Sequence, residues 1–126
     1  MAKEKRAVKW FAFLIFSQLR EAFLLLYGAV MGLCLISAKE IDTYRRRRNA
    51  LLIDLREPED YRQWHIPGAR NVPVEELEMF MEHASKERLM IFYCQHGNAS
   101  IQEGCRYVKR GYRICSVAGG MEAYQV

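Results

Sequence analysis

The chain has 126 residues, of which 51% are hydrophobic and 27% charged, and its formal net charge is +4. This length allows one domain with an extension and excludes two domains, and the composition excludes a disordered chain. Basic residues gather at the N-terminus and at residues 45–48, so no field suited to nucleic acid covers the whole protein. The four cysteines lack the spacing of a disulfide scaffold and predict free thiols in a reducing compartment.

The N-terminal segment is basic over residues 1–9 and strongly apolar over residues 10–36, except at Arg20 and Glu21. The uncharged run after this pair, residues 22–36, is shorter than the roughly 20 residues that cross a bilayer. A span over residues 10–32 would therefore carry the charge pair near its centre, which is costly unless both side chains find partners.

Three interpretations of this segment remain open: a membrane anchor, a helical hairpin packed on the domain or on a second copy, or a chain whose true start is Met31. A cleaved signal peptide fits less well, because the run is long and no small-residue cleavage site follows it. Gly28 and Gly32 form a Gly-x-x-x-Gly pair, a weak indication of helix dimerisation. We therefore divide the chain into an extension, residues 1–32, and a domain, residues 33–126.

From residue 33 onward, strands and helices are expected to alternate. A short strand is expected at 33–36, and Ser37 with Glu40 forms a capping box that opens a helix over 37–48. The apolar run 50–55 predicts a strand buried on both faces, with Asp54 at its C-terminal end.

Proline and glycine then predict a loop-rich stretch from residue 58 to residue 73. The remaining expected elements are a helix over 74–84, a strand over 89–93, a helix over 100–110 and a strand over 112–117. This alternation indicates an α/β fold: a small doubly wound, mostly parallel sheet flanked by helices.

Cys94 follows a buried strand and precedes a glycine-bearing loop that leads into a helix. A thiol at that junction lies among free backbone N–H groups and near the positive end of the helix dipole, which favours the thiolate. Cys94 is therefore the candidate nucleophile. Cys105 and Cys115 lie in apolar patterns and are expected to fill the core. Cys94 and His96 alone make no metal site, so none is expected.

Four short motifs resemble, in their order and spacing, the rhodanese-like domain of sulfurtransferases. They lie at residues 53–58 (Ile-Asp-Leu-Arg-Glu-Pro), 65–69 (His-Ile-Pro-Gly-Ala), 93–100 (Tyr-Cys-x-x-Gly, ending in Ser) and 111–120 (Gly-Tyr, then Gly-Gly). The resemblance covers the chain from about Leu33 to its C-terminus.

The resemblance implies that Cys94 accepts a sulfane sulfur as a persulfide and passes it to a thiophilic acceptor. The donor would be thiosulfate or a persulfide, the acceptor a thiol or cyanide, with a partner protein's cysteine as a further candidate. The persulfide is the only covalent intermediate and no cofactor is expected. The substrate-binding loop would be Gln95, His96, Gly97, Asn98, Ala99 and Ser100, and the residues supporting it Asp54, Arg56 and His65. A reduced Cys94 favours a cytoplasmic domain, free or anchored to the inner face of the membrane.

The loop departs from the family pattern at Ala99, where sulfurtransferases active on thiosulfate usually carry arginine. A charge-assisted hydrogen bond contributes about 1.5 to 3 kcal/mol, so its loss should weaken thiosulfate turnover by about ten- to a hundred-fold. His96 or Arg106 could supply the missing cation. Ala99 also keeps an alternative open: a catalytically weak binding or regulatory module on the same fold.

The related phosphatases close their loop with an arginine six positions after the cysteine, where this chain has Ser100. Without that guanidinium, phosphomonoester hydrolysis lacks support for its transition state. The sequence therefore favours sulfur transfer over phosphate chemistry.

Overall fold

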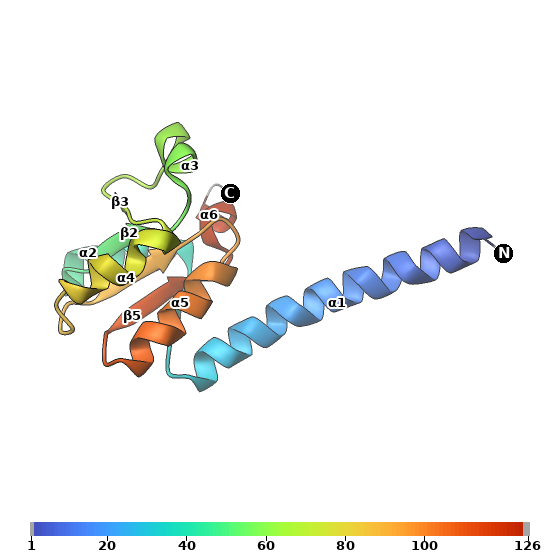
Figure 1. Ribbon diagram of the computed structural model, residues 1–126, viewed down its shortest axis with the longest axis horizontal. Coiled ribbons are helices and arrows are strands. Elements are labelled where there is room, and N and C mark those ends of the chain that lie inside the picture. The colour runs from blue at the N-terminus through green and yellow to red at the C-terminus, as the bar shows by residue number, and fades with distance from the viewer. Residues whose placement is uncertain (1, 125–126) are drawn as a thin grey trace.

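The protein was analysed as a computed structural model that describes residues 2–124. The chain begins with one long helix and then alternates short strands and helices (Figure 1). The elements, in chain order, are α1 (Ala2–Val30), β1 (Cys34–Ile36), a 3₁₀ helix (Ala38–Glu40), α2 (Ile41–Arg48), β2 (Leu51–Asp54), α3 (Pro58–Gln63), β3 (Arg70–Asn71), α4 (Val74–Glu82), β4 (Met90–Tyr93), α5 (Asn98–Lys109), β5 (Ile114–Val117) and α6 (Gly120–Tyr124).

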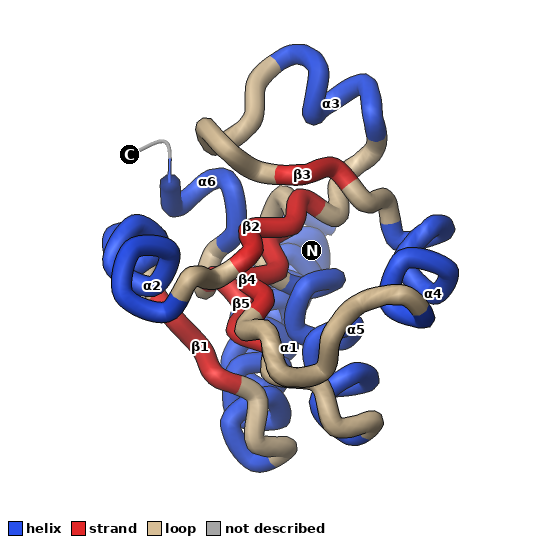
Figure 2. Tube along the Cα trace, turned by 90° about the vertical axis from the view of Figure 1, so that its left-hand side faces the viewer, coloured by secondary structure: helices blue, strands red, loops and turns tan. Residues whose placement is uncertain are grey.

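The five strands form one parallel sheet in the order β1-β5-β4-β2-β3. Helices cover both faces: α2 and α6 lie on one side of the sheet, and α1, α4 and α5 lie on the other (Figure 2). The predicted doubly wound fold class is therefore confirmed. In such sheets, functional groups gather at the carboxyl ends of the strands, next to the point where the strand order reverses.

Alternate side chains of each strand enter two separate cores, as the pleat requires. In β4, Met90 and Phe92 pack under α4 and α5, whereas Ile91 and Tyr93 pack under α2 and α6. All four side chains are buried. This two-sided burial explains why the central strands read as unbroken apolar runs in the sequence.

The structure differs from the expected elements mainly in short segments. The helix expected over 37–48 begins with a 3₁₀ turn, held by Glu40, whose carboxylate accepts the Ser37 backbone N–H at 3.0 Å. The stretch expected as loop contains α3, with Pro58 at its first turn, and β3. The Gly119–Gly120 pair after β5 leads into α6, a helix that was not among the expected elements. A proline at N1 favours a helix start, so Pro58 was a signal for α3.

The N-terminal extension is one continuous helix, so the hairpin interpretation is wrong. The proposed Gly-x-x-x-Gly dimer face is also wrong. A Cβ on Gly28 would lie 3.3 Å from Ile101 of α5, which means that this position already faces the domain. Gly32 lies beyond the end of α1, in a turn with φ +81°.

Only the last turns of α1 contact the domain. Leu24 and Met31 pack against the core under α5, and Leu33 lies within it. The first part of α1 projects away from the domain with its large apolar side chains exposed (Figure 1). Phe11 and Phe16, for example, are 66% and 73% exposed. By length and composition, residues Lys5–Gly28 could cross a membrane.

Two contacts show where α1 leaves the domain. Gly28 faces Ile101 in the first turn of α5, whereas Leu33 contacts Gly104 one turn later. α1 and α5 lie on the same face of the sheet and lead into the parallel neighbours β1 and β5, so the two helices run in the same direction. Traced toward its N-terminus, α1 passes the start of α5, where Gly28 faces Ile101. It projects from the end of the sheet where the strands have their carboxyl ends (Figure 1).

Candidate functional site

Cys94 lies directly after β4, in the short loop that leads into α5. The loop turns through Gly97, which has φ +99° and precedes the first residue of α5. A residue with a side chain would be strained in this left-handed conformation. The loop therefore presents the thiol to the N-terminus of a twelve-residue helix.

Two backbone N–H groups point at the sulfur. The N–H of Gly97 donates to Cys94 Sγ at 3.1 Å, and the N–H of Ser100 donates at 3.4 Å. Ser100 Oγ lies 3.6 Å from Sγ and can accept the thiol proton. Donors of this kind, at the positive end of a helix, favour the thiolate over the thiol.

Ser116 holds the Ser100 side chain in place from the neighbouring strand. The two hydroxyl oxygens are 2.7 Å apart, and Ser100 Oγ also donates to the Gly97 carbonyl at 3.1 Å. Both serines are fully buried. Because a buried hydroxyl needs a partner, this pair fixes the position of Ser100 beside the sulfur.

The start of α6 closes the loop from the other side. The backbone N–H of Met121 donates to the Cys94 carbonyl at 2.8 Å, and that of Glu122 donates to the Gln95 carbonyl at 3.3 Å. A Cβ on Gly120 would lie 2.8 Å from the Gly97 nitrogen and would overlap the Cys94 carbonyl. Gly120 is therefore required for the close approach of α6 to the loop.

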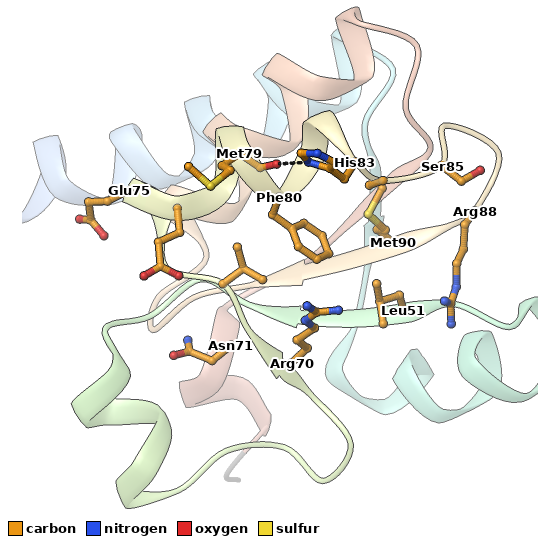
Figure 3. Close-up of a pocket in the computed structure, with 13 residues that line it drawn as sticks. Leu51, Arg70, Asn71, Glu75, Met79, Phe80, His83, Ser85, Arg88 and Met90 are labelled. Carbon is orange, nitrogen blue, oxygen red and sulfur yellow. Dashed lines mark hydrogen bonds between the residues drawn. The ribbon is translucent and has the colours of Figure 1, made fainter.

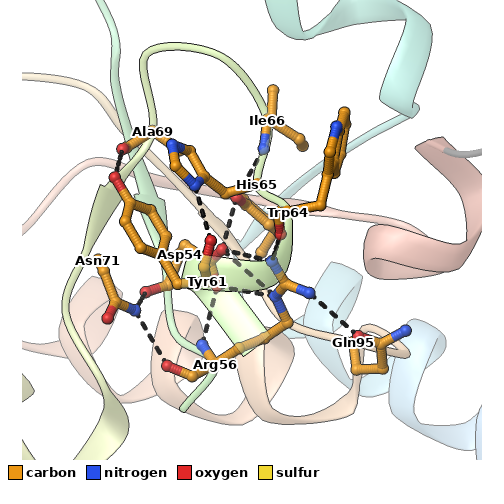
Figure 4. A network of polar contacts seen from close by, with 10 residues as sticks. Asp54, Arg56, Tyr61, Trp64, His65, Ile66, Ala69, Asn71 and Gln95 are labelled. Carbon is orange, nitrogen blue, oxygen red and sulfur yellow. Dashed lines mark hydrogen bonds and ion pairs between the residues drawn. The ribbon is translucent and has the colours of Figure 1, made fainter. Parts of the chain in front are cut away.

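A buried ion pair lies beside the loop, at the end of β2 (Figure 4). Asp54 is fully buried, and its carboxylate accepts hydrogen bonds from Arg56 Nε at 3.1 Å and Nη2 at 2.9 Å. Tyr93 donates its hydroxyl to the same carboxylate at 2.6 Å. Burial, together with this bond, raises the pKa of Tyr93 well above its usual value, so the hydroxyl stays a donor.

Arg56 joins this pair to the Cys94 loop and to the segment after α3. Its Nη1 donates to Gln95 Oε1 at 3.3 Å, and its Nη2 donates to the Trp64 carbonyl at 2.7 Å (Figure 4). The Arg56 side chain is only 8% exposed. The guanidinium is therefore used internally, as a support for the loop.

The segment around His65 is held by its own contacts. His65 Nδ1 lies 2.8 Å from the Tyr61 carbonyl, and the two rings stack at 3.7 Å (Figure 4). Asn71 then donates from Nδ2 to the carbonyls of Asp54 and Arg56, both at 3.0 Å. Arg56 therefore contacts the Cys94 loop directly and Asp54 acts through Arg56, while His65 holds the path of the chain after α3.

Cys94 forms part of an open pocket of about 320 Å³. The residue Cys94 is 7% exposed, and this pocket gives access to it. The residues lining it come from the ends of β2 and β4 and from the starts of α3 and α5. They are Leu55, Arg56, Glu57, Asp60, Cys94, Gln95, His96, Asn98 and Ala99.

The two cations that could replace the missing loop arginine are paired elsewhere. His96 Nδ1 lies 3.0 Å from Glu122, and both side chains are well exposed. Arg106 contacts Glu78 at 2.7 Å and Glu103 at 3.6 Å. Neither one extends the set of donors at Cys94.

Two of the other cysteines, Cys105 and Cys115, behave as core residues. Cys105 and Cys115 are 2% and 1% exposed, and burial raises the pKa of both thiols. A raised pKa keeps a thiol protonated and unreactive. This contrast leaves Cys94 as the cysteine with the surroundings of a nucleophile.

A larger pocket, of about 900 Å³, opens between α4 and the β2–β3 side of the sheet (Figure 3). Phe80 lines it, with the Arg70 guanidinium 4.9 Å from its ring centre. It extends from Leu51 and Met90, at the starts of their strands, to Asn71 at the end of β3. Its lining contains no cysteine, so we place the chemistry at the smaller pocket.

Sequence reasoning missed Ser116, Tyr93, Asn71 and Gly120 as parts of the site. A serine inside the apolar strand 114–117 was a signal for Ser116, because a buried hydroxyl needs a partner. Gly120 was recognised as a turn residue, but its contact with the Cys94 loop depends on a helix that the sequence did not predict. No local sequence pattern marks Asn71 or Tyr93 as part of the site.

Comparison with known proteins agrees with this geometry. The rhodanese-like domain family matches residues 37–126. Thiosulfate sulfurtransferase GlpE from Coxiella burnetii is 28% identical over 81 residues, which is 64% of this chain and 76% of the relative. The enzyme of the same name from Ectopseudomonas mendocina is 30% identical over 81 residues, covering 64% and 74%.

The solved structures agree as well. The structure of reduced Bacillus anthracis CoADR-RHD superposes with a TM-score of 0.67 and 28% identity, over 73% of this chain and 16% of that one. The match of residues 37–126, together with the sheet order and the Cys94 loop, assigns this chain to the rhodanese-like family, in which its relatives are named as sulfurtransferases.

Proposed function

We propose that this protein is a sulfurtransferase in which Cys94 carries a sulfane sulfur as a persulfide. The observation that carries the proposal is the pair of backbone N–H groups, from Gly97 and Ser100, directed at the Cys94 sulfur. A persulfide on Cys94 puts a partly anionic outer sulfur in this surrounding, where fixed donors can stabilise it.

The transfer takes place in two balanced steps. The Cys94 thiolate attacks the outer sulfur of a donor persulfide, the donor's S–S bond breaks, and the donor leaves as a thiolate with the bonding electron pair. An acceptor thiolate then attacks the outer sulfur on Cys94, forms a new persulfide and returns Cys94 as a thiolate. The number of electrons is unchanged overall, so no oxidant or cofactor takes part.

A persulfide suits this pocket better than thiosulfate does. Thiosulfate carries a sulfonate that needs a cation, and the position that would supply it is Ala99. His96 and Arg106 are engaged with carboxylates. We therefore propose a small or protein-bound persulfide as the donor and a thiol as the acceptor, with cyanide as a substitute acceptor in assays.

Mass spectrometry of the intact chain tests the sulfur carrier directly. After incubation with a persulfide donor, the wild-type chain should gain one sulfur that a thiol acceptor removes, and Cys94→Ser should gain none. Cys105→Ser serves as the matched control and should still gain the sulfur. Absence of any adduct on the wild-type chain would favour the alternative, a catalytically weak binding or regulatory module on the same fold.

We also propose that α1 attaches the domain to a membrane, with the domain in the cytoplasm, where Cys94 stays reduced. Leu24 packs on the domain, so the part of the candidate span that a bilayer could surround is residues 5–23, about 28 Å of helix, against a hydrocarbon core of about 30 Å. Arg20 lies three residues before the end of this part, about 4.5 Å along the axis, so its long side chain can extend toward the headgroups. Large apolar side chains on all sides of the projecting part, including Phe11, Phe13 and Phe16, suit lipid better than a one-sided partner groove.

A further inference from the structure

The entrance to the Cys94 pocket carries two carboxylates that stand outside the ion pairs of the described residues. Glu57 and Asp60 line the pocket and are both exposed. None of the ion pairs within residues 2–124 involves either of them. Both come from the start of α3, so a short helix holds the two charges at the same rim.

The cations of the same lining are already matched. Arg56 is paired with the buried Asp54, and its remaining bonds go to Trp64 and Gln95. His96 is paired with Glu122 at the surface. Because Arg56 is matched by Asp54 and the His96 ring lies against the Glu122 carboxylate, the carboxylates of Glu57 and Asp60 make the charge at the entrance negative, and the Cys94 thiolate adds to it.

We propose that Glu57 and Asp60 select a sulfur donor in which a positive charge lies next to the persulfide. The proposal rests on the proposed function, since it concerns the donor of the same cysteine. A small aminothiol persulfide has this chemistry, and so does a protein cysteine persulfide flanked by lysine or arginine. An anionic donor meets like charges at the entrance and again at the thiolate, which adds to the effect of Ala99.

The expected discrimination is modest because both carboxylates are in contact with water. Charges at a solvated surface interact weakly and are screened by salt. We therefore expect the rate of sulfur loading to differ by about tenfold between cationic and anionic donors at low ionic strength, and to differ less as salt is added.

The test compares three donors of similar size: the persulfides of cysteamine (positive), 2-mercaptoethanol (neutral) and 3-mercaptopropionate (negative). The rate at which the full chain gains one sulfur on Cys94 is followed by mass spectrometry at low and high salt. We expect the order positive, neutral, negative. The double variant E57Q/D60N should lose this order, whereas E59Q, on the same helix but outside the pocket lining, should keep it.

A second arm distinguishes the two sources of the charge. Peptide persulfides with lysine or with glutamate on both sides of the cysteine are compared in the same way. If a protein is the natural donor, the lysine peptide persulfide should load Cys94 faster than cysteamine persulfide does. If a small molecule is the natural donor, cysteamine persulfide should load it faster. The readout is a ratio between donors, so a general loss of rate in a variant does not affect it.

The outcomes separate this proposal from the one on which it rests. Loading by the neutral donor without any dependence on charge overturns the selection by Glu57 and Asp60 and leaves the sulfurtransferase intact. A charge order that persists in E57Q/D60N overturns it as well. No loading by any donor overturns both.

Discussion

The three buried cysteines of the domain show how one residue type takes different roles from its surroundings. Cys105 and Cys115 lie among apolar side chains, and burial raises the pKa of each thiol. Cys94 is nearly as buried, yet two backbone N–H groups at a helix start face its sulfur. Burial alone therefore does not decide reactivity; the donors in contact with the sulfur do.

The loop position of Ala99 gives the first prediction. Ala99→Arg should raise thiosulfate turnover by about ten- to a hundred-fold, because a guanidinium there can bind the sulfonate through a charge-assisted hydrogen bond. Sulfite release with cyanide as the acceptor measures it. Ala99→Gln, of similar length but neutral, should show no comparable gain. Equal turnover in the wild type and Ala99→Arg would mean that Ala99 does not limit the use of thiosulfate.

The Asp54–Arg56 pair gives the second prediction. Removing one member of a buried ion pair leaves an uncompensated charge, so Asp54→Ala should lower the free energy of unfolding by about 3–5 kcal/mol. Asp42→Ala is the control. It breaks an exposed pair with Arg45 at 3.8 Å and should cost less than about 1 kcal/mol. Urea denaturation measures both, and similar losses would contradict the supporting role of Asp54.

At the residue scale, the sequence predicted the groups that follow strands and missed those that depend on distant pairing. Asp54 and Cys94 stand at the ends of apolar runs, a position that marks sites in parallel sheets. Ser116 became visible only when the register placed β5 beside β4, next to Cys94. Asn71 binds Asp54 and Arg56 across 17 and 15 residues, a relation that no local pattern contains.

At the scale of elements, α4 and α5 are linked by a cluster around Glu78. The carboxylate accepts from Arg106 at 2.7 Å, from Arg110 at 2.9 Å and from the Tyr107 hydroxyl at 3.1 Å. The hydrogen bond from Arg110 lowers the pKa of Glu78, and the Tyr107 bond adds to it. Burial raises the pKa of Tyr107 to about 12, so its hydroxyl remains a donor.

This cluster predicts a pH dependence. A carboxyl whose pKa is lowered in the folded state stabilises it above the unfolded pKa of about 4.5, and the contribution is lost as the pH falls through the lowered value. Glu78→Gln should therefore be less stable than the wild type at pH 7, and the difference should shrink below about pH 4. Urea denaturation at both pH values measures it, with the exposed Glu75→Gln as the control. A constant difference would contradict the linkage.

The elements that the sequence missed are all short. α3, β3 and α6 have six, two and five residues, too few to show a period. β3 exists through its pairing with the end of β2, and α6 through its contacts with the Cys94 loop. The longer elements, such as α4 and α5, were predicted because their apolar stripes repeat over several turns.

At the scale of the whole molecule, the projecting helix α1 separates the interpretations that the sequence left open. Its length as one helix rules out a hairpin, and Gly28 packs on the domain. The alternation of strands and helices in the sequence had already predicted the parallel sheet of the domain. The direction of α1 could not be read from the sequence, because it depends on where its last turns meet α5.

The membrane proposal is tested by fractionating cells that express the full chain. We expect the protein in the membrane fraction, resistant to high salt and released by detergent. The double variant Phe13→Glu with Phe16→Glu should move to the soluble fraction, since each charge in a span costs about 3 kcal/mol. Phe13→Leu with Phe16→Leu, the matched control, should stay in the membrane. A wild-type chain that is wholly soluble and monomeric would refute the anchor, and a soluble dimer would favour a second copy.

The exit of α1 at the Cys94 end of the sheet has a consequence for how sulfur reaches the protein. A bilayer around α1 would face the entrance of the Cys94 pocket, because Gly28 is level with the first turn of α5. The helix from Leu24 to Gly28 adds about 7.5 Å between the domain and the bilayer core, a distance comparable to the headgroup layer. A sulfur carrier held in the same bilayer would diffuse along the membrane and meet the Cys94 pocket directly. A large carrier from bulk water would have to enter the narrow space between the membrane surface and the pocket.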